Sequence, residues 1–389
     1  MESFEHKPLP TTEHEATALI GSGNKHSWNI KVAKIAAVTV AVIASALVIA
    51  AASPSMEGHT PPCVDIGPPY LLATMHGGGG NHAVNNVVKF SRNGCTMSTG
   101  VLEKSKDVSL RELRGLAVLP SGNLVVLNAY RLNSQVLLYG SCSEEDHATR
   151  PFTGHALDAE AKDQEHDDDK ENDAGDDTGD PMLVHPYGVT ANADASRVFV
   201  SNQDTCSISA LATGEVEEVI GNERVVFGPC SRRESDHDHN RDDDKKDMSK
   251  IRGVALDAAG LLYVADQQKG LVVYNMTTSQ MLGSTTCYQC IGVYYDKASD
   301  SIFSGSESKN EVYQIAPWPS LERVATLGKD SGGLLSHPAG LAAHNNTLFV
   351  VSQDKRLVLK FDIPTGHYQG IAVAHTLDND MEGLILSPC

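Results

Sequence analysis

Aromatic side chains are scarce in this chain of 389 residues: Phe, Trp and Tyr make up 5% of it, and only 2 residues are Trp. A core must therefore be built mainly from Val, Leu, Ile and Ala, and the hydrophobic content of 41% is sufficient for a globular fold. Basic residues are also in deficit, because 31 Lys and Arg face 50 Asp and Glu, which gives a net charge of −19. That balance argues against nucleic acid as a partner, since its phosphates would be repelled.

Several motifs of catalysis and metal binding are missing. No Gly-x-Ser-x-Gly nucleophile elbow and no EF-hand calcium pattern occurs in the sequence. The four glycines at 77–80 are not followed by the Lys of a phosphate-binding loop, so they are interpreted as a flexible loop. The sequence thus gives no support for an elbow-type serine hydrolase or a Walker-type nucleotide hydrolase.

One long uncharged run is present, from Ile35 to Ala52, and it predicts a single transmembrane helix. Lys residues precede it and Glu57 is the first charge after it, so the positive-inside rule places residues 1–34 in the cytoplasm as a disordered tail. A cleaved signal peptide is the alternative, because small residues at 50–53 suit a peptidase, but the leader is long for one. We expect an uncleaved signal anchor, a stalk at 53–64 and an extracellular or lumenal remainder, as in a single-pass type II protein.

Cysteines and glycosylation sequons agree with export. No cysteine occurs before residue 63, and the eight that follow are an even number, as expected for disulfides in an oxidising compartment. Acceptor sequons occur at Asn275-Met276-Thr277 and Asn345-Asn346-Thr347, which predicts a glycoprotein.

A glycine begins a short apolar segment six times, and this repeat predicts the fold. The six are Gly115, Gly188, Gly253, Gly292, Gly340 and Gly383. Each is followed by strand-like runs separated by polar turns, and a strand repeat of roughly 40 residues is typical of a β-propeller. Second strands are expected at Asn123–Asn128, Arg197–Asn202, Leu261–Asp266, Ser301–Gly305 and Thr347–Ser352, and third strands at Gln135–Tyr139, Ser207–Leu211, Gly270–Asn275, Glu311–Ile315 and Arg356–Phe361.

The two ends of the repeat region complete one another. Tyr70–Thr74 and Asn86–Phe90 form a second and a third strand without a first, whereas the segment after Glu382 forms a first strand with nothing after it. The sequence therefore predicts an all-β, six-bladed β-propeller over residues 65–389, closed by the C-terminal strand. A disulfide between Cys63 and Cys389 would staple this join, although eight cysteines allow 105 pairings.

The repeat resembles the NHL-type propeller family over about residues 65–389. The matching segments are His185-Pro186-Tyr187-Gly188-Val189 with 198–202, Ile251-Arg252-Gly253-Val254-Ala255 with 262–266, and His337-Pro338-Ala339-Gly340-Leu341 with 348–352. The resemblance implies a fold, and it leaves function open because the family includes binding scaffolds and a few enzymes.

Two acidic insertions lengthen the first two repeats, at about 144–180 and 231–250. Neither has hydrophobic periodicity, so both are expected to be mobile loops on one rim of the propeller. Their carboxylates suit a divalent cation such as calcium or a basic protein partner, and His237 with His239 adds softer metal ligands. A solvated insertion without a dedicated site is the simpler interpretation, because blades tolerate long loops.

The residues just before the repeat glycines are expected to ring the channel mouth. Arg114, Tyr187, Arg252 and Glu382 are the candidate ligand-binding residues, since paired guanidiniums suit a carboxylate or phosphate. They suit a structural ion-pair network equally well. His185 and His337, three positions before their glycines, are candidate metal ligands together with Glu382.

The ring resembles the sites of two enzyme families of similar architecture only in part. Gluconolactonase-like hydrolases use several acidic and amide ligands, and only Glu382 matches that resemblance. Zinc lyases resembling peptidyl-hydroxyglycine lyases need three ligands, and His76 or His82 would have to join the two His-Pro histidines. The Cys287-x-x-Cys290 spacing favours a structural disulfide over redox catalysis. The sequence thus favours a binding or scaffolding module, with a metal-dependent hydrolase or lyase as the alternative.

Overall fold

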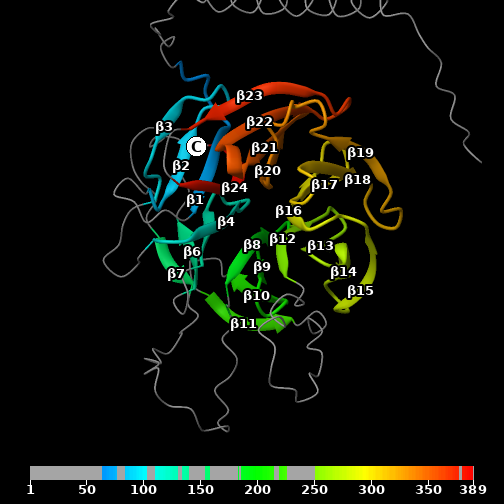
Figure 1. Ribbon diagram of the computed structural model, residues 1–389. Helices are drawn as coiled ribbons and strands as arrows, with labels where there is room; N and C mark the ends of the chain where they lie inside the picture. Colours follow the sequence, from blue (N-terminus) through cyan, green and yellow to red (C-terminus); the bar gives the residue numbers. More distant parts are fainter. Residues whose placement is uncertain are drawn as a thin grey trace, which may run out of the picture. The chain divides into compact units, whose positions relative to one another are not determined.

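The computed structural model describes residues 64–76, 84–102, 110–129, 134–139, 154–157, 183, 185–213, 219–225, 250–375 and 379–388. Six four-stranded antiparallel sheets surround a common centre, as Figure 1 shows. No helix among these residues is long and apolar enough to cross a membrane. The span predicted at 35–52, the tail and the stalk up to residue 63 lie outside the described residues.

Each sheet is one blade of a β-propeller, which confirms the predicted all-β, six-bladed fold. Blades 1 to 3 contain β4 (Leu113–Val118), β5 (Leu124–Asn128), β6 (Gln135–Tyr139) and β7 (Gly154–Leu157); β8 (Pro186–Ala191), β9 (Arg197–Asn202), β10 (Ser207–Thr213) and β11 (Val219–Val225); and β12 (Ile251–Leu256), β13 (Leu261–Asp266), β14 (Gly270–Asn275) and β15 (Gln280–Thr285). Blades 4 and 5 contain β16 (Cys290–Asp296), β17 (Ser301–Ser306), β18 (Glu311–Ile315) and β19 (Arg323–Leu327); and β20 (Pro338–His344), β21 (Thr347–Ser352), β22 (Leu357–Asp362) and β23 (Tyr368–Ala374). A short 3-10 turn, Gln353–Lys355, follows β21.

The sixth blade joins the two ends of the repeat region, as predicted. It consists of β24 (Asp380–Ser387), β1 (Tyr70–His76), β2 (Val87–Phe90) and β3 (Thr96–Ser98), in that order across the sheet. The inner strand β24 pairs with β1 from Tyr70 opposite Ser387 to His76 opposite Asp380. A closed ring leaves no long unpaired edge between first and last blades.

The core lies between the faces of neighbouring blades. One cluster packs Tyr263 and Leu271 of blade 3 against Ile302 and Tyr313 of blade 4. Every residue of β5 and of β17 is buried, although β17 contains three Ser and one Gly. The outer strands were not predicted, and exposure explains this: β15 and β19 begin with exposed residues and contain no buried residue except the last of β19.

Part of the first predicted insertion is ordered into the sheet. Residues 154–157, inside the range 144–180, form the outer strand β7, so the insertion is not continuous. The remaining residues of that range, and the second insertion apart from Lys250, lie outside the described residues.

The inner strands all begin at one end of the propeller, which we call the mouth face. Register defines this end: Pro186 lies opposite Asn202, Ile251 opposite Asp266 and Pro338 opposite Ser352. The first-to-second strand turns and the third-to-fourth strand turns therefore lie at the opposite face. Residues at strand beginnings of the inner ring share the mouth face.

The six repeat glycines let the main chains of adjacent blades touch. A Cβ on Gly188 would lie 2.7 Å from the carbonyl oxygen of Arg252, and one on Gly383 would lie 2.5 Å from that of Arg114. The same holds around the ring, because each of the other four glycines faces main-chain atoms of the next blade. Any side chain here would force two blades apart.

Replacing Gly188 by Ala is expected to lower the free energy of unfolding by about 2 kcal/mol or more, because main chain rather than a flexible side chain must move. Urea unfolding of the full chain measures this. Gly100→Ala is the control, since its Cβ would meet only the Asn86 side chain at 3.7 Å. Equal unfolding midpoints for the two variants would contradict the role assigned to the glycine ring.

Candidate functional site at the channel mouth

Four predicted residues meet at the mouth of the channel. Arg114, Tyr187, Arg252 and Glu382, which we call the mouth cluster, each directly precede a repeat glycine on β4, β8, β12 and β24. Because those glycines touch the next blade, the residue before each is held at a fixed place around the ring. The structure therefore brings together the four residues that the sequence selected.

Tyr187 lies at the centre of the mouth cluster and is 6% exposed. Its hydroxyl donates a hydrogen bond to Oε1 of Glu382. The guanidinium carbons of Arg114 and Arg252 lie 5.1 and 5.6 Å from the ring centroid, within the range of cation–π attraction. One buried ring thus contacts both arginines and the carboxylate.

Glu382 is 3% exposed, and its carboxylate has several partners. Gln353 Nε2 donates to Oε2 at 2.7 Å, and Arg114 Nη1 lies 3.6 Å from Oε1. Burial acts to raise the pKa of Glu382, but Arg114, His76 and the Tyr187 hydrogen bond outweigh it, so this pKa lies below its ordinary value. Burial, with the nearby carboxylate, raises the pKa of Tyr187 well above its ordinary value. At neutral pH the pair is therefore a carboxylate accepting from a neutral phenol.

The second arginine has its own carboxylate. Arg252 Nη1 lies 2.9 Å from Oε2 of Glu307, in the turn after β17, and His337 Nδ1 lies 3.8 Å from the other oxygen of Glu307. Two guanidiniums and two carboxylates therefore balance at the mouth. The geometry favours the ion-pair network over a strongly cationic pocket, the two alternatives that the sequence left open.

Two hydroxyl groups fix the main chain of the two arginines. Thr74 Oγ1 accepts from the Gly383 N–H at 2.8 Å and donates to the carbonyl of Arg114. Ser201 Oγ in the same way accepts from the Gly188 N–H at 2.8 Å and donates to the carbonyl of Arg252. Each hydroxyl bridges its own blade to the next, so we call these contacts the blade bridges. Neither blade bridge is predicted by the sequence pattern.

Below the mouth cluster, a cavity of about 320 Å³ follows the inner strands. Tyr187 and Glu382 line its mouth end, and Leu116, Val254 and Leu341 are among the apolar residues along its wall. A volume of this size is at the lower end of the range for small-molecule sites. Two residues of the mouth cluster, Tyr187 and Glu382, therefore border the channel at the mouth face.

The candidate metal ligands are engaged with separate partners. His185 Nδ1 lies 3.0 Å from Asp204 Oδ2, His337 is beside Glu307, and Glu382 binds Tyr187. Both histidines have a left-handed φ of 51° before a proline, so they occupy equivalent turns. Within the described ranges, no three His, Cys, Asp or Glu side chains form a group suited to a metal ion. His82, His237 and His239 lie outside the described residues.

His76 is the described histidine that was expected as a possible third zinc ligand. It ends β1, and burial, together with the charge of Arg114, lowers its pKa. Its Nδ1 is buried without a hydrogen-bond partner among the described residues. At neutral pH the His76 imidazole is therefore uncharged, and its charge acts on Glu382 only at lower pH.

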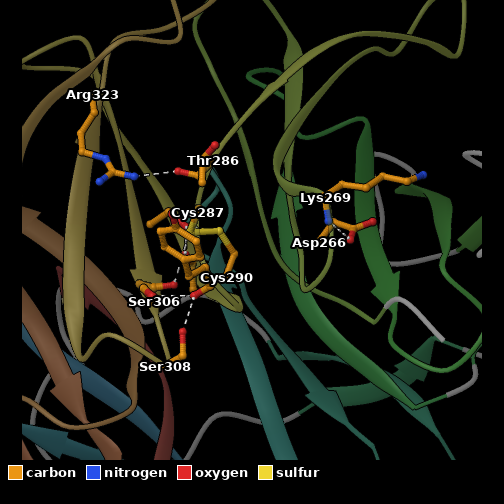
Figure 2. The surroundings of a disulfide bond; sticks show 12 residues. Asp266, Lys269, Thr286, Cys287, Cys290, Ser306, Ser308 and Arg323 are labelled. Carbon is orange, nitrogen blue, oxygen red and sulfur yellow. Dashed lines mark hydrogen bonds between the residues drawn. A yellow bond between two sulfur atoms is a disulfide. The ribbon is translucent and has the colours of Figure 1, made fainter. Parts of the chain in front are cut away.

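The Cys287–Cys290 pair forms a disulfide at the start of blade 4, which confirms a disulfide at this spacing. Figure 2 shows the surrounding hydrogen bonds: Ser306 and Ser308 donate to the carbonyl of Tyr288 between the cysteines, at 2.5 and 3.4 Å. Arg323 donates to the Thr286 carbonyl at 2.8 Å. Cys95 and Cys206 are also disulfide-bonded. The predicted Cys63–Cys389 pair lies outside the described residues.

Comparison with known proteins supports the fold alone. No family model and no curated protein matches the sequence. Among solved structures, a chain in a nidogen–laminin complex has a TM-score of 0.54 at 11% identity, covering 82% of this chain and 98% of that one. A periplasmic gluconolactonase from Pseudomonas aeruginosa has a TM-score of 0.49 at 12% identity, covering 78% and 81%. An inactive virginiamycin B lyase from Staphylococcus aureus, with quinupristin, has a TM-score of 0.47 at 8% identity, covering 82% and 93%. The chain is therefore a β-propeller, and its NHL-type assignment stays a prediction.

Replacing Glu382 by Gln is expected to lower the free energy of unfolding by about 3 kcal/mol at neutral pH, because Arg114 loses its buried counter-charge. Since the folded-state pKa of Glu382 lies below 4.5, its ordinary value, this contribution is complete above that pH and is lost as the pH falls below it. Urea unfolding of both proteins across this range measures the difference.

Asp380→Asn is the matched control on the same strand, because Asp380 is half-exposed and 3.9 Å from Arg356. Its effect is expected to be at most about 1 kcal/mol. A Glu382→Gln variant no less stable than this control, or a difference that grows in acid, would contradict the proposed ion-pair network.

Proposed function

We propose that this chain is a membrane-anchored binding or scaffolding module whose propeller is displayed outside the cytoplasm and recognises its partner through the mouth face. The observation that supports this is the mutual engagement of the mouth cluster. Arg114, Tyr187 and Glu382 contact one another on rigid strands, which gives a mouth face that is ordered before any partner binds. The long uncharged run at 35–52 and the even number of cysteines favour the anchored, exported placement.

The alternative, a metal-dependent hydrolase or lyase, has less support from the geometry. A catalytic zinc needs three protein ligands, and a calcium cage needs more. Glu382 uses both carboxylate oxygens on Tyr187, Gln353 and Arg114, and each His-Pro histidine faces one carboxylate. Among the residues that the structure describes, no contact at the mouth favours substrate chemistry.

The acidic insertions favour a basic protein as the partner. The second insertion leaves the propeller after β11 and returns at β12, and both of these ends belong to the mouth face, since Val225 pairs with Ile208 next to the Asn202 end of β9. Asp and Glu outnumber Lys and Arg by 15 to 3 at 144–180 and by 7 to 6 at 231–250, so the acidic excess comes mainly from the first insertion. Electrostatic attraction of a basic surface follows from that composition.

Metal content separates the two functions. After exhaustive dialysis without chelator, plasma mass spectrometry of the full chain is expected to find well under one zinc or calcium per chain, because the candidate ligands are already paired with protein groups. About one tightly held ion per chain, lost in Glu382→Gln, His185→Ala or His337→Ala, would overturn the binding proposal in favour of the enzyme.

Binding of the full chain to poly-lysine tests the acidic insertions directly. Deleting 160–180 or 235–247 is expected to weaken binding severalfold and to reduce its dependence on salt, because screened charge pairs are lost. A variant with the same length but with Asp and Glu of 160–180 changed to Asn and Gln is the matched control for loop length. Unchanged affinity in that variant, which keeps Lys162 and Lys170 but no acidic residue at 160–180, would contradict the role of the first insertion.

A further inference from the structure

The two glycosylation sequons lie at exposed hairpin turns. Asn345 and Asn346 form the two-residue turn between β20 and β21, where His344 pairs with Thr347. Both have positive φ, 48° and 61°, as a type I′ turn requires, and Asn345 is exposed. The Asn345 side chain makes no hydrogen bond to any residue that the structure describes.

The second sequon begins at the last residue of β14. Asn275 Oδ1 accepts from the N–H groups of Thr277 and Thr278 at 2.9 and 3.1 Å, which is an Asx turn. Asn275 is half-buried, and the four residues after Met276 are exposed. Asn275 Nδ2, the atom that would carry a glycan, donates no hydrogen bond within the described part of the chain.

Both sequons belong to the same face. Asn275 lies opposite Leu261 and Gln280, at the end of blade 3 remote from the Ile251–Asp266 pair. Thr347 lies opposite His344, at the end of blade 5 remote from the Pro338–Ser352 pair. Since those remote pairs define the mouth face, Asn275 and Asn345 are both on the face opposite the mouth cluster.

We infer that N-linked glycans on Asn275 and Asn345 cover the face opposite the mouth and leave the mouth face open for the partner. The donor is an oligosaccharide linked to a membrane lipid through diphosphate. The amide nitrogen forms a bond to the first sugar carbon, the bond from that carbon to the diphosphate oxygen breaks, and the amide loses a proton while the lipid diphosphate leaves. The inference rests on the proposed display outside the cytoplasm.

A bulky hydrophilic glycan on each of two blades restricts protein contacts by excluded volume. Blades 3 and 5 flank blade 4 in the ring, so the two glycans lie on one face in sectors that are separated by blade 4. The mouth face has no sequon in the described loops. Partner docking is thereby directed to the end of the propeller that has Arg114, Arg252 and the ends of the second acidic insertion.

The test is site-resolved glycan mapping of the full chain made in a eukaryotic cell. Peptide N-glycosidase converts a glycosylated Asn to Asp, and tandem mass spectrometry is expected to find this conversion at both Asn275 and Asn345. Asn275→Gln and Asn345→Gln should each remove one glycan. Asn346→Gln keeps its sequon and should remove none, so it is the matched control.

Unmodified Asn275 and Asn345 would overturn the inference. Protease protection in sealed vesicles then tests separately whether the propeller lies outside the cytoplasm. A protected but unmodified propeller leaves the membrane proposal standing. An unmodified propeller digested from the cytoplasmic side overturns the proposed display as well.

Poly-lysine binding tests the direction of the shielding. The Asn275→Gln/Asn345→Gln variant should bind poly-lysine with the same affinity as the glycosylated chain that has no substitutions. Gln267→Asn/Lys269→Thr, which creates a sequon in the β13–β14 turn of the mouth face, should bind severalfold more weakly once glycosylated. Equal effects from glycans on the two faces would overturn the assigned shielding.

Discussion

The main chains of neighbouring blades touch at the six repeat glycines, and the rest of the propeller depends on this contact. With Cβ positions only 2.5–2.7 Å from a neighbouring carbonyl at Gly115, Gly188, Gly253 and Gly383, no other residue fits without separating the blades. Close approach at the centre allows the apolar faces of adjacent sheets to pack over their full width. The sparse aromatics are then sufficient, since Val and Leu fill the narrow interblade space.

The same contact positions the mouth cluster. Each of its residues directly precedes a ring glycine, and the blade bridges of Thr74 and Ser201 hold the carbonyls of Arg114 and Arg252. Side chains fixed in this way lose little further entropy when they pair, so the network of Tyr187 and Glu382 forms at low conformational cost. A surface that is already ordered also binds a partner with a smaller entropic penalty.

Much of this arrangement follows from sequence pattern, and the remainder depends on contacts between distant segments. The glycine spacing predicted the blades, their inner three strands, the closing strand and the membership of the mouth cluster. It did not predict Gln353 as a partner of Glu382 or Glu307 as the partner of Arg252, because those pairs depend on register between blades. The outer strands were not predicted, because exposed apolar residues such as Met281 and Val324 leave no clear alternation of apolar and polar residues.

Closure by β24 also has a consequence for biosynthesis. Gly383 follows Thr74 by 309 residues, so β1 is made long before the strand that will pair with its inner edge. At ordinary translation rates this interval is roughly 15–60 s. During that time the hydrogen-bonding edge of β1 is open to other nascent strands. A chaperone that occupies this edge during synthesis would therefore matter more for this protein than for a fold whose neighbouring strands follow one another in the chain.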